Sequence, residues 1–176
     1  MKRRDFMAGL GIAGVAGLGS VASAAGAADR EYFELRRYRL HGGEKKNMLG
    51  NFLRDVGIPA MNRVGIGPVG VFMAKYGPSD PTLYVLMVHK NIQSVLTAAD
   101  RLLADEKFAN SDFVKASSGD VGYARVESSL MTAFKDMPKL EVPEKRSRIF
   151  ELRIYESHSI KAGKKKVEMF NEGGEI

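Results

Sequence analysis

Two short stretches of this chain carry the same set of side chains, and each set could hold a small molecule. The sets are Glu34, Arg36 and Tyr38 in the first stretch and Glu151, Arg153 and Tyr155 in the second. A guanidinium group binds carboxylates and other anions, and a phenol can donate a hydrogen bond. The spacing therefore predicts a polar-lined cavity for a small anionic or aromatic ligand. The structural alternative is an ion pair between the glutamate and the arginine of each set.

His89 is a further candidate for this site. It ends an apolar run, and a histidine there is either a general base or a sheet-end residue whose neighbours satisfy it. The other two histidines, His41 and His158, follow the two repeated stretches and are predicted to lie in turns. The chain has no cysteine. The sequence predicts neither a metal site nor a cofactor.

The two stretches belong to a longer repeat that organises the chain. Six of the nine positions from 33 to 41 return at 150 to 158, 117 residues later. A repeated strand predicts a repeated folding unit. Successive side chains of a strand point to opposite faces, so each polar set shares one face. We expect Phe33 and Leu35 to pack beneath helices, with the polar set facing a second sheet.

The part of the chain from 29 to 135 has the order of a ferredoxin-like unit. The expected strands are 32–40, 69–76, 83–89 and 123–134. The third of these is apolar on both faces and is therefore placed centrally in the sheet. Amphipathic helices are predicted over 44–56, with a break at Gly57 to Pro59, and after Asn91, the expected cap. The buried stripe of the second helix is predicted as Ile92, Val95, Leu96, Ala99, Leu102 and Leu103.

The predicted fold class is therefore α+β. The order β-α-β-β-α-β is ferredoxin-like and gives a four-stranded antiparallel sheet with both helices on one face. A second face is left open, and we expect the protein to cover it with itself, through the second repeat or in a homodimer.

A second unit is predicted to begin after a linker. Residues 136–147 carry Pro138 and Pro143 among charged side chains, which favours a linker. Residues 148–176 then indicate one strand, at 149–156, and one helix from about Lys161. We interpret them as the start of a truncated second copy. The alternative is a short form whose last strand adds to the edge of the first sheet or to a partner.

Residues 1–28 are typical of a twin-arginine export signal. Arg3, Arg4 and Phe6 precede a glycine- and alanine-rich apolar run, and cleavage sites are predicted after Ala24 and Ala27. The expected partner is the twin-arginine translocation machinery, and the expected location is the periplasm or the cell envelope. An uncleaved segment that anchors the protein in the membrane is the alternative.

The formal charge is +6, but lysines and arginines are interspersed with acidic residues along the chain. The one tight basic cluster, Lys161 to Lys166, is interpreted as the solvated face of a helix. No nucleic-acid partner is predicted.

Several segments of the chain resemble the NIPSNAP family of the dimeric α+β barrel superfamily. They are Tyr32–Leu40, Gly67–Phe72, Tyr84–His89, Leu103–Asp105 with Phe108, and the second copy at Phe150–Tyr155. The resemblance implies tandem ferredoxin-like units that pack sheet against sheet. It implies no defined reaction, because the biochemical activity of the family is poorly defined. Small monooxygenases and haem-degrading enzymes are distant superfamily relatives, and they offer an analogy only.

Two functions follow as hypotheses from different classes. The first is an exported, non-catalytic module that binds a small molecule or a protein. The second is a cofactor-independent monooxygenase or isomerase that acts on a small substrate inside the barrel. The first rests on the absence of a recognisable catalytic set in the sequence, and the second on the polar sets and the superfamily analogy.

Overall fold

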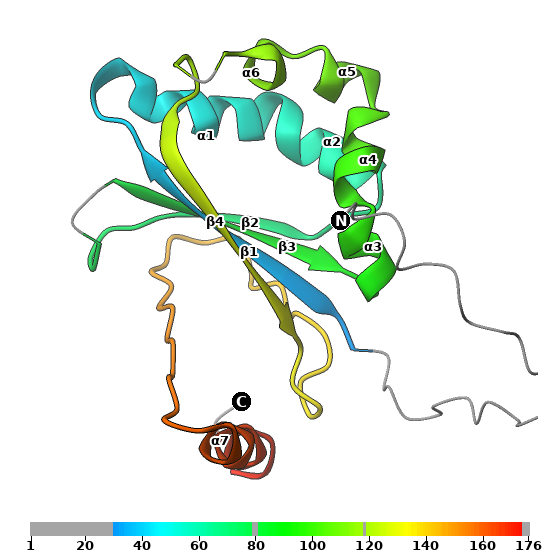
Figure 1. Cartoon of the computed structure of the whole chain (residues 1–176), viewed down its shortest axis with the longest axis vertical. Coiled ribbons are helices and arrows are strands. Elements are labelled where there is room, and N and C mark those ends of the chain that lie inside the picture. Colours follow the sequence, from blue (N-terminus) through cyan, green and yellow to red (C-terminus); the bar gives the residue numbers. More distant parts are fainter. Residues whose placement is uncertain (1–29, 79–80, 118, 174–176) are drawn as a thin grey trace, which may run out of the picture.

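The computed structural model describes residues 30–78, 81–117 and 119–173. In this part of the chain, four strands form one antiparallel sheet and short helices cover one of its faces (Figure 1). The strands are β1 (Tyr32–Leu40), β2 (Val69–Met73), β3 (Thr82–His89) and β4 (Tyr123–Thr132). The helices over the sheet are η1 (Gly43–Asn47), α1 (Met48–Phe52), η2 (Leu53–Gly57), α2 (Ile58–Arg63), α3 (Ile92–Leu96), α4 (Ala98–Leu103), α5 (Glu106–Ala109) and α6 (Asp112–Lys115).

The sheet has the strand order β2-β3-β1-β4, with every neighbouring pair antiparallel. This is the predicted ferredoxin-like topology. Strand β3 lies between β2 and β1, as expected for a run that is apolar on both faces. Strands β2 and β4 are the two edges of the sheet.

The first helical region is more continuous than the sequence predicts. The helical backbone runs from Gly43 to Arg63 through η1, α1, η2 and α2. A break was expected at Gly57 to Pro59, and this expectation is wrong. Pro59 lies at the start of α2, directly after a wider helical turn, and such a turn accommodates a residue that has no N–H to donate within the helix. The residues before it, Leu53–Gly57, are wound as a π-helix.

The second helical region is more broken than predicted. Asn91 caps α3 as expected, and its side chain accepts a hydrogen bond from the Ser94 amide. Thr97 then leaves the helical region of backbone space and separates α3 from α4. The predicted stripe is therefore mostly wrong. Leu102 is buried and Val95 is half-buried, but the other four residues are exposed: Ile92, Leu96, Ala99 and Leu103.

The core lies between the helices and the sheet. Its buried apolar side chains are Leu40, Leu49, Leu53, Ala60, Met61, Ile66, Leu83, Val85, Met87, Ala98 and Leu102. Phe52 stacks on Phe113 with ring centroids 4.2 Å apart, which joins α1 to α6. Full burial of one such large apolar side chain stabilises a fold by about 1.5–3 kcal/mol. The shared core fixes which face of the sheet the helices cover.

The chain after β4 lies on the other side of the sheet. There it forms an extended segment and then α7 (Ile160–Glu172), as Figure 1 shows. The strand predicted at 149–156 is not formed, because this segment pairs with no strand in the described part of the chain. The Asn171 side chain accepts hydrogen bonds from the amides of Lys135 and Asp136, which holds α7 near the end of β4.

The predicted signal at 1–28 lies outside the described residues. Among the residues that are described, no helix has the length and apolar character needed to cross a membrane.

Candidate functional site

The polar set of β1 faces the helices and not the open side of the sheet. In the register of the sheet, Glu34 lies opposite Met87 and Tyr38 lies opposite Leu83, and both partners belong to the core. Tyr38 also packs against this core directly. The expected orientation is therefore wrong. Because β1 carries apolar side chains on both of its faces, its alternation alone could not tell which face the helices would cover.

Glu34 and Arg36 form an ion pair beneath the helical layer. Arg36 Nε lies 2.7 Å from Glu34 Oε1, and Arg36 Nη2 lies 3.3 Å from Glu34 Oε2. Ser128 on β4 donates a hydrogen bond of 2.7 Å to the same carboxylate. Burial alone would raise the pKa of Glu34, but the hydrogen bonds from Arg36 and Ser128 lower it overall. Glu34 is thus held as a carboxylate at neutral pH.

Arg36 and Tyr38 keep their ordinary protonation states at neutral pH. Burial would lower the pKa of Arg36, but its hydrogen bond with Glu34 and its interactions with Tyr38 raise it overall. Burial raises the pKa of Tyr38, so its hydroxyl stays protonated. Its ring meets Tyr123 edge to face, with centroids 5.2 Å apart. The set therefore combines a neutralised ion pair with an aromatic core contact.

His89 joins this cluster from the end of β3. It is fully buried, and its Nδ1 lies 3.1 Å from the hydroxyl oxygen of Ser94. Its Nε2 lies 3.9 Å from Glu34 Oε2 and has no hydrogen-bond partner among the residues that the structure describes. Burial lowers the pKa of His89, although the charge of Glu34 acts in the opposite direction. The imidazole is neutral at pH 7.

Arg101 on α4 completes the cluster, and the sequence did not suggest it. One of its nitrogens, Nη2, donates to both the carbonyl and the hydroxyl of Ser94, at 2.8 Å each. The other, Nη1, donates to the carbonyl of Val64 at the end of α2. Arg101 thereby ties α2, α3 and α4 together over His89. Nothing in the local sequence marks Arg101 or Ser128, because their roles depend on contacts between distant parts of the chain.

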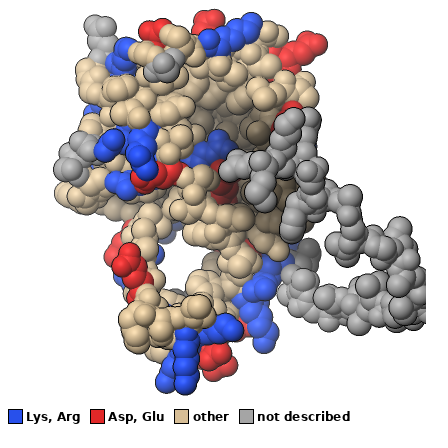
Figure 2. Space-filling model, in the orientation of Figure 1, with Lys and Arg blue, Asp and Glu red and all other residues tan. Residues whose placement is uncertain are grey.

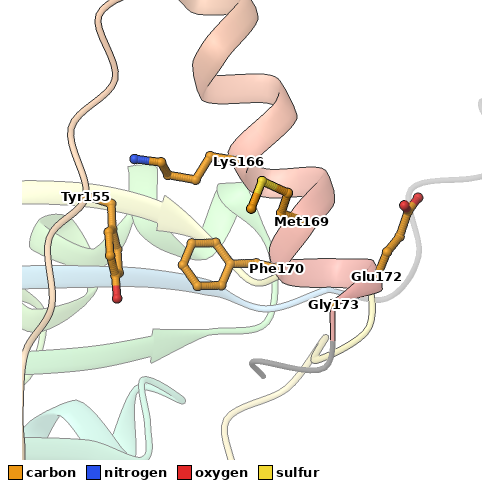
Figure 3. A pocket seen from close by; sticks show the side chains of 6 residues that line it. All are labelled: Tyr155, Lys166, Met169, Phe170, Glu172 and Gly173. Atoms are coloured by element: carbon orange, nitrogen blue, oxygen red, sulfur yellow. The ribbon is translucent and has the colours of Figure 1, made fainter.

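The second polar set does not reach the first. Glu151 and Arg153 form their own ion pair at 3.0 Å, and both are exposed. A hydrogen bond from Arg153 lowers the pKa of Glu151. Tyr155 packs against Phe170 of α7, in a shallow surface pocket that Lys166 also lines (Figure 3). The predicted cavity between the two sets is therefore not formed, and each set shows the alternative interpretation, an ion pair.

The sheet face away from the helices is apolar at its centre. We call it the open sheet face and define it by the apolar side chains that point away from the helices in the register of the sheet: Phe33, Leu35, Phe72, Leu86, Val88 and Met131. Among them Val88 is buried and Met131 is exposed, while the other four are half-buried. Charged side chains border it, including the ion pair of Arg37 with Glu127. Phe150 of the extended segment meets Phe72 here, with ring centroids 5.0 Å apart.

Comparison with known proteins identifies the family. The sequence profile of the NIPSNAP family matches residues 33–138 of the chain. The chain belongs to the NIPSNAP family. The match covers the sheet from the second residue of β1 onward together with its helices, and it ends within the linker that precedes residues 149–156 of this NIPSNAP protein.

Solved structures support the fold of this NIPSNAP protein. A NIPSNAP-like domain protein from Burkholderia xenovorans is 19% identical with a TM-score of 0.51, over 64% of this chain and 93% of that one. A NIPSNAP family protein from Agrobacterium tumefaciens is 19% identical with a TM-score of 0.50, over 62% of this chain and 90% of that one. A comparison with curated proteins found no match.

The two ion pairs of this NIPSNAP protein offer a matched test of burial. We expect Glu34→Gln to lower the free energy of unfolding by about 2–3 kcal/mol, because it leaves Arg36 largely desolvated without its counter-charge. Glu151→Gln, at the equivalent position of the repeat, should leave the free energy of unfolding unchanged. Urea unfolding of both variants measures the difference. Equal effects of the two substitutions would contradict the buried role of Glu34.

His89 should make stability depend on pH. Its pKa in the folded chain lies below the ordinary value of 6.5, so below that pH the unfolded chain binds a proton that the folded chain does not. The free energy of unfolding should therefore fall as pH drops from 6.5 towards the folded pKa, by at most about 1.4 kcal/mol per pH unit. His89→Gln should remove this slope and His41→Gln should keep it, as measured by urea unfolding across pH. A slope that persists in His89→Gln would assign it to other groups.

Proposed function

We propose that this NIPSNAP protein is an exported protein-interaction module whose open sheet face packs against the open sheet face of a second copy. The observation that carries the proposal is the division of the sheet into a face that helices α1 to α6 cover and an apolar face that these helices leave open and the chain after β4 covers only in part. Helices α1 to α6 bury the first, while Phe33, Leu35 and Leu86 lie at the centre of the second. A sheet with two apolar faces needs a layer on each.

The size and chemistry of the open sheet face suit a second sheet. Four strands about 4.8 Å apart and roughly 25 Å long present a face of about 19 by 25 Å. Two such faces together would bury on the order of 1,000 Å², which is about the minimum for a biological interface between proteins. The row from Gly70 through Leu86 and Leu35 to Ser129 carries no charge, so it can pack closely against another sheet.

The chain itself argues for a partner of the same kind. It carries a second Phe-Glu-Leu-Arg-x-Tyr stretch, and that stretch already touches the open sheet face through Phe150. The polar cluster supports small-molecule binding less well, because the Arg36 guanidinium that would hold an anion is already neutralised by Glu34. An enzyme acting on a small substrate stays a prediction from the sequence.

The proposed place of action is outside the cytoplasm. Arg3, Arg4 and Phe6, followed by a weakly apolar run, support export by the twin-arginine route. This route carries folded proteins, and the sheet with its helices would form before export. Cleavage after Ala24 or Ala27 would leave the family domain intact.

Mass measurement tests the proposed pairing. We expect the purified protein to have twice the mass of one chain by light scattering, because pairing removes two apolar faces from water. Leu35→Glu should reduce this to the mass of one chain, since it places a charge at the centre of the open sheet face.

Leu103→Glu is the matched control for this experiment. Leu103 is an exposed leucine in the helical layer, so its substitution should leave the dimer intact. Far-UV circular dichroism checks that both variants are folded. A wild-type protein with the mass of a single chain, or a dimer that survives Leu35→Glu, would overturn the proposal.

Fractionation of cells tests the export step. Replacing both signal arginines, in Arg3→Lys with Arg4→Lys, should abolish the processed protein in the periplasmic fraction, while Lys2→Arg should leave it unchanged. Mass spectrometry of the wild-type N-terminus should find Ala25 or Ala28 as the first residue. Unchanged processing in the double variant would rule out this route.

A further inference from the structure

We propose that residues 149–156 of one copy add as a fifth strand along the free edge of β4 in the second copy. The inference deepens and rests on the proposed pairing of two copies, because it names a second contact within the pair. It follows from two unpaired features of one chain, an exposed strand edge and an exposed strand-like segment.

The free edge belongs to β4. This strand is the longest of the sheet, and no strand lies beyond it in the described part of the chain. All of its residues after Tyr123 are exposed, including Val126 and Leu130. A long exposed edge presents a row of backbone N–H and C=O groups that can pair with another strand. The β4 edge is therefore a template for strand addition.

The segment at 149–156 has the sequence of a strand but no strand partner. It repeats the pattern of β1, which β4 already pairs with on its other side. Two of its apolar side chains lie largely in solvent, with Ile154 77% exposed and Ile149 75% exposed. Exposure of these apolar side chains to water is unfavourable unless the segment pairs with a strand or packs against another apolar surface. Addition to a sheet edge removes both its apolar surface and its unpaired backbone groups from water.

One antiparallel register matches the two partners in charge and in burial. With Arg153 opposite Glu127, Glu151 falls opposite Ser129, so no like charges meet there. The same register places the apolar residues of the segment on the helix side of the sheet, where two of the three face apolar residues of β4 and one faces a serine. These facing pairs are Phe150 with Leu130, Leu152 with Ser128 and Ile154 with Val126.

The geometry of the linker points to a second copy as the donor. Within one chain the linker is held beside the start of β1, where the Glu31 amide donates to the Pro138 carbonyl at 2.9 Å. The Leu140 amide donates to the Glu31 carboxylate at 2.7 Å. Phe150 then lies against Phe72 of β2, at the opposite edge of the sheet and about 14 Å from β4 across three strand spacings. The linker of each chain thus leads the start of its own segment, at Phe150, away from its own β4. The end of the segment, at Tyr155, packs on Phe170, which contacts Phe134 just after β4 and leaves the edge of β4 itself unpaired among the described strands.

Pairing of the open sheet faces would release the segment from its present position. Phe150 occupies part of the open sheet face through its contact with Phe72. A second sheet that packs on this face competes for the same apolar surface. The displaced segment is then close to the second copy, whose β4 edge offers the complementary register.

Disulfide trapping tests the register between two copies. The chain has no cysteine, so each introduced thiol is unique. We mix Val126→Cys protein with Ile154→Cys protein and oxidise, because facing residues of an antiparallel pair bring their Cβ atoms within reach of a disulfide. The expected product is a crosslinked heterodimer as the dominant species. The matched control mixes Val126→Cys with Ile149→Cys, which lies five residues out of register, and should lose this product.

Each outcome decides between the two proposals. A dimer by light scattering without the crosslink between positions 126 and 154 overturns the strand addition and leaves the proposed face pairing standing. A single-chain mass without a crosslink overturns both. A third protein carries both substitutions, Val126→Cys and Ile154→Cys, in one chain. A disulfide within that single chain would show that the segment pairs with its own β4, and it would overturn the assignment to a second copy. Circular dichroism of each single variant confirms that folded protein is being trapped.

Discussion

A strand in the middle of a single sheet has two faces, and the fold of this chain supplies a layer for one of them. Strand β1 illustrates this constraint. Its neighbours β3 and β4 satisfy its backbone, and the helices cover Glu34, Arg36 and Tyr38. The side chains that alternate with these, including Phe33 and Leu35, point to the open sheet face. Because the helices cover only one face, the apolar side chains of the other face are left to contact other segments. The contact of Phe150 with Phe72 is one example.

The sequence predicted what depends on local pattern. Strand alternation, the Asn91 cap and the order of elements all arise from neighbours a few residues apart, and the structure bears these predictions out. The faces of β1 were predicted the wrong way round, because both of its faces have side chains that can be buried. Burial of Glu34 becomes favourable only when Arg36 and Ser128 satisfy its carboxylate, and Ser128 lies 94 residues away along the chain.

The helical errors have a similar origin. Leu96 and Leu103 fit the period of a continuous helix, and the sequence therefore placed them in its buried stripe. The structure breaks that helix at Thr97, and Arg101 then lies over His89 and donates to the Val64 carbonyl. A tertiary contact of this kind can outweigh the small preference of a few residues for one unbroken helix. Local periodicity could not reveal it.

The repeat places the same glutamate and arginine in two environments. In β1 the pair is largely buried, and Ser128 donates a further hydrogen bond to its glutamate. The pair of Glu151 and Arg153 is exposed to solvent. Identical local sequence therefore gives an interaction of very different strength, because water screens one pair and not the other. A strand laid along β4 would place Leu152 beside Ser128 and exclude water from the hydrogen bond between Ser128 and Glu34. Lower local polarity strengthens both that hydrogen bond and the ion pair with Arg36. Assembly at the β4 edge and stability of the buried cluster would then reinforce each other, which links the open side of the sheet to the side that the helices cover.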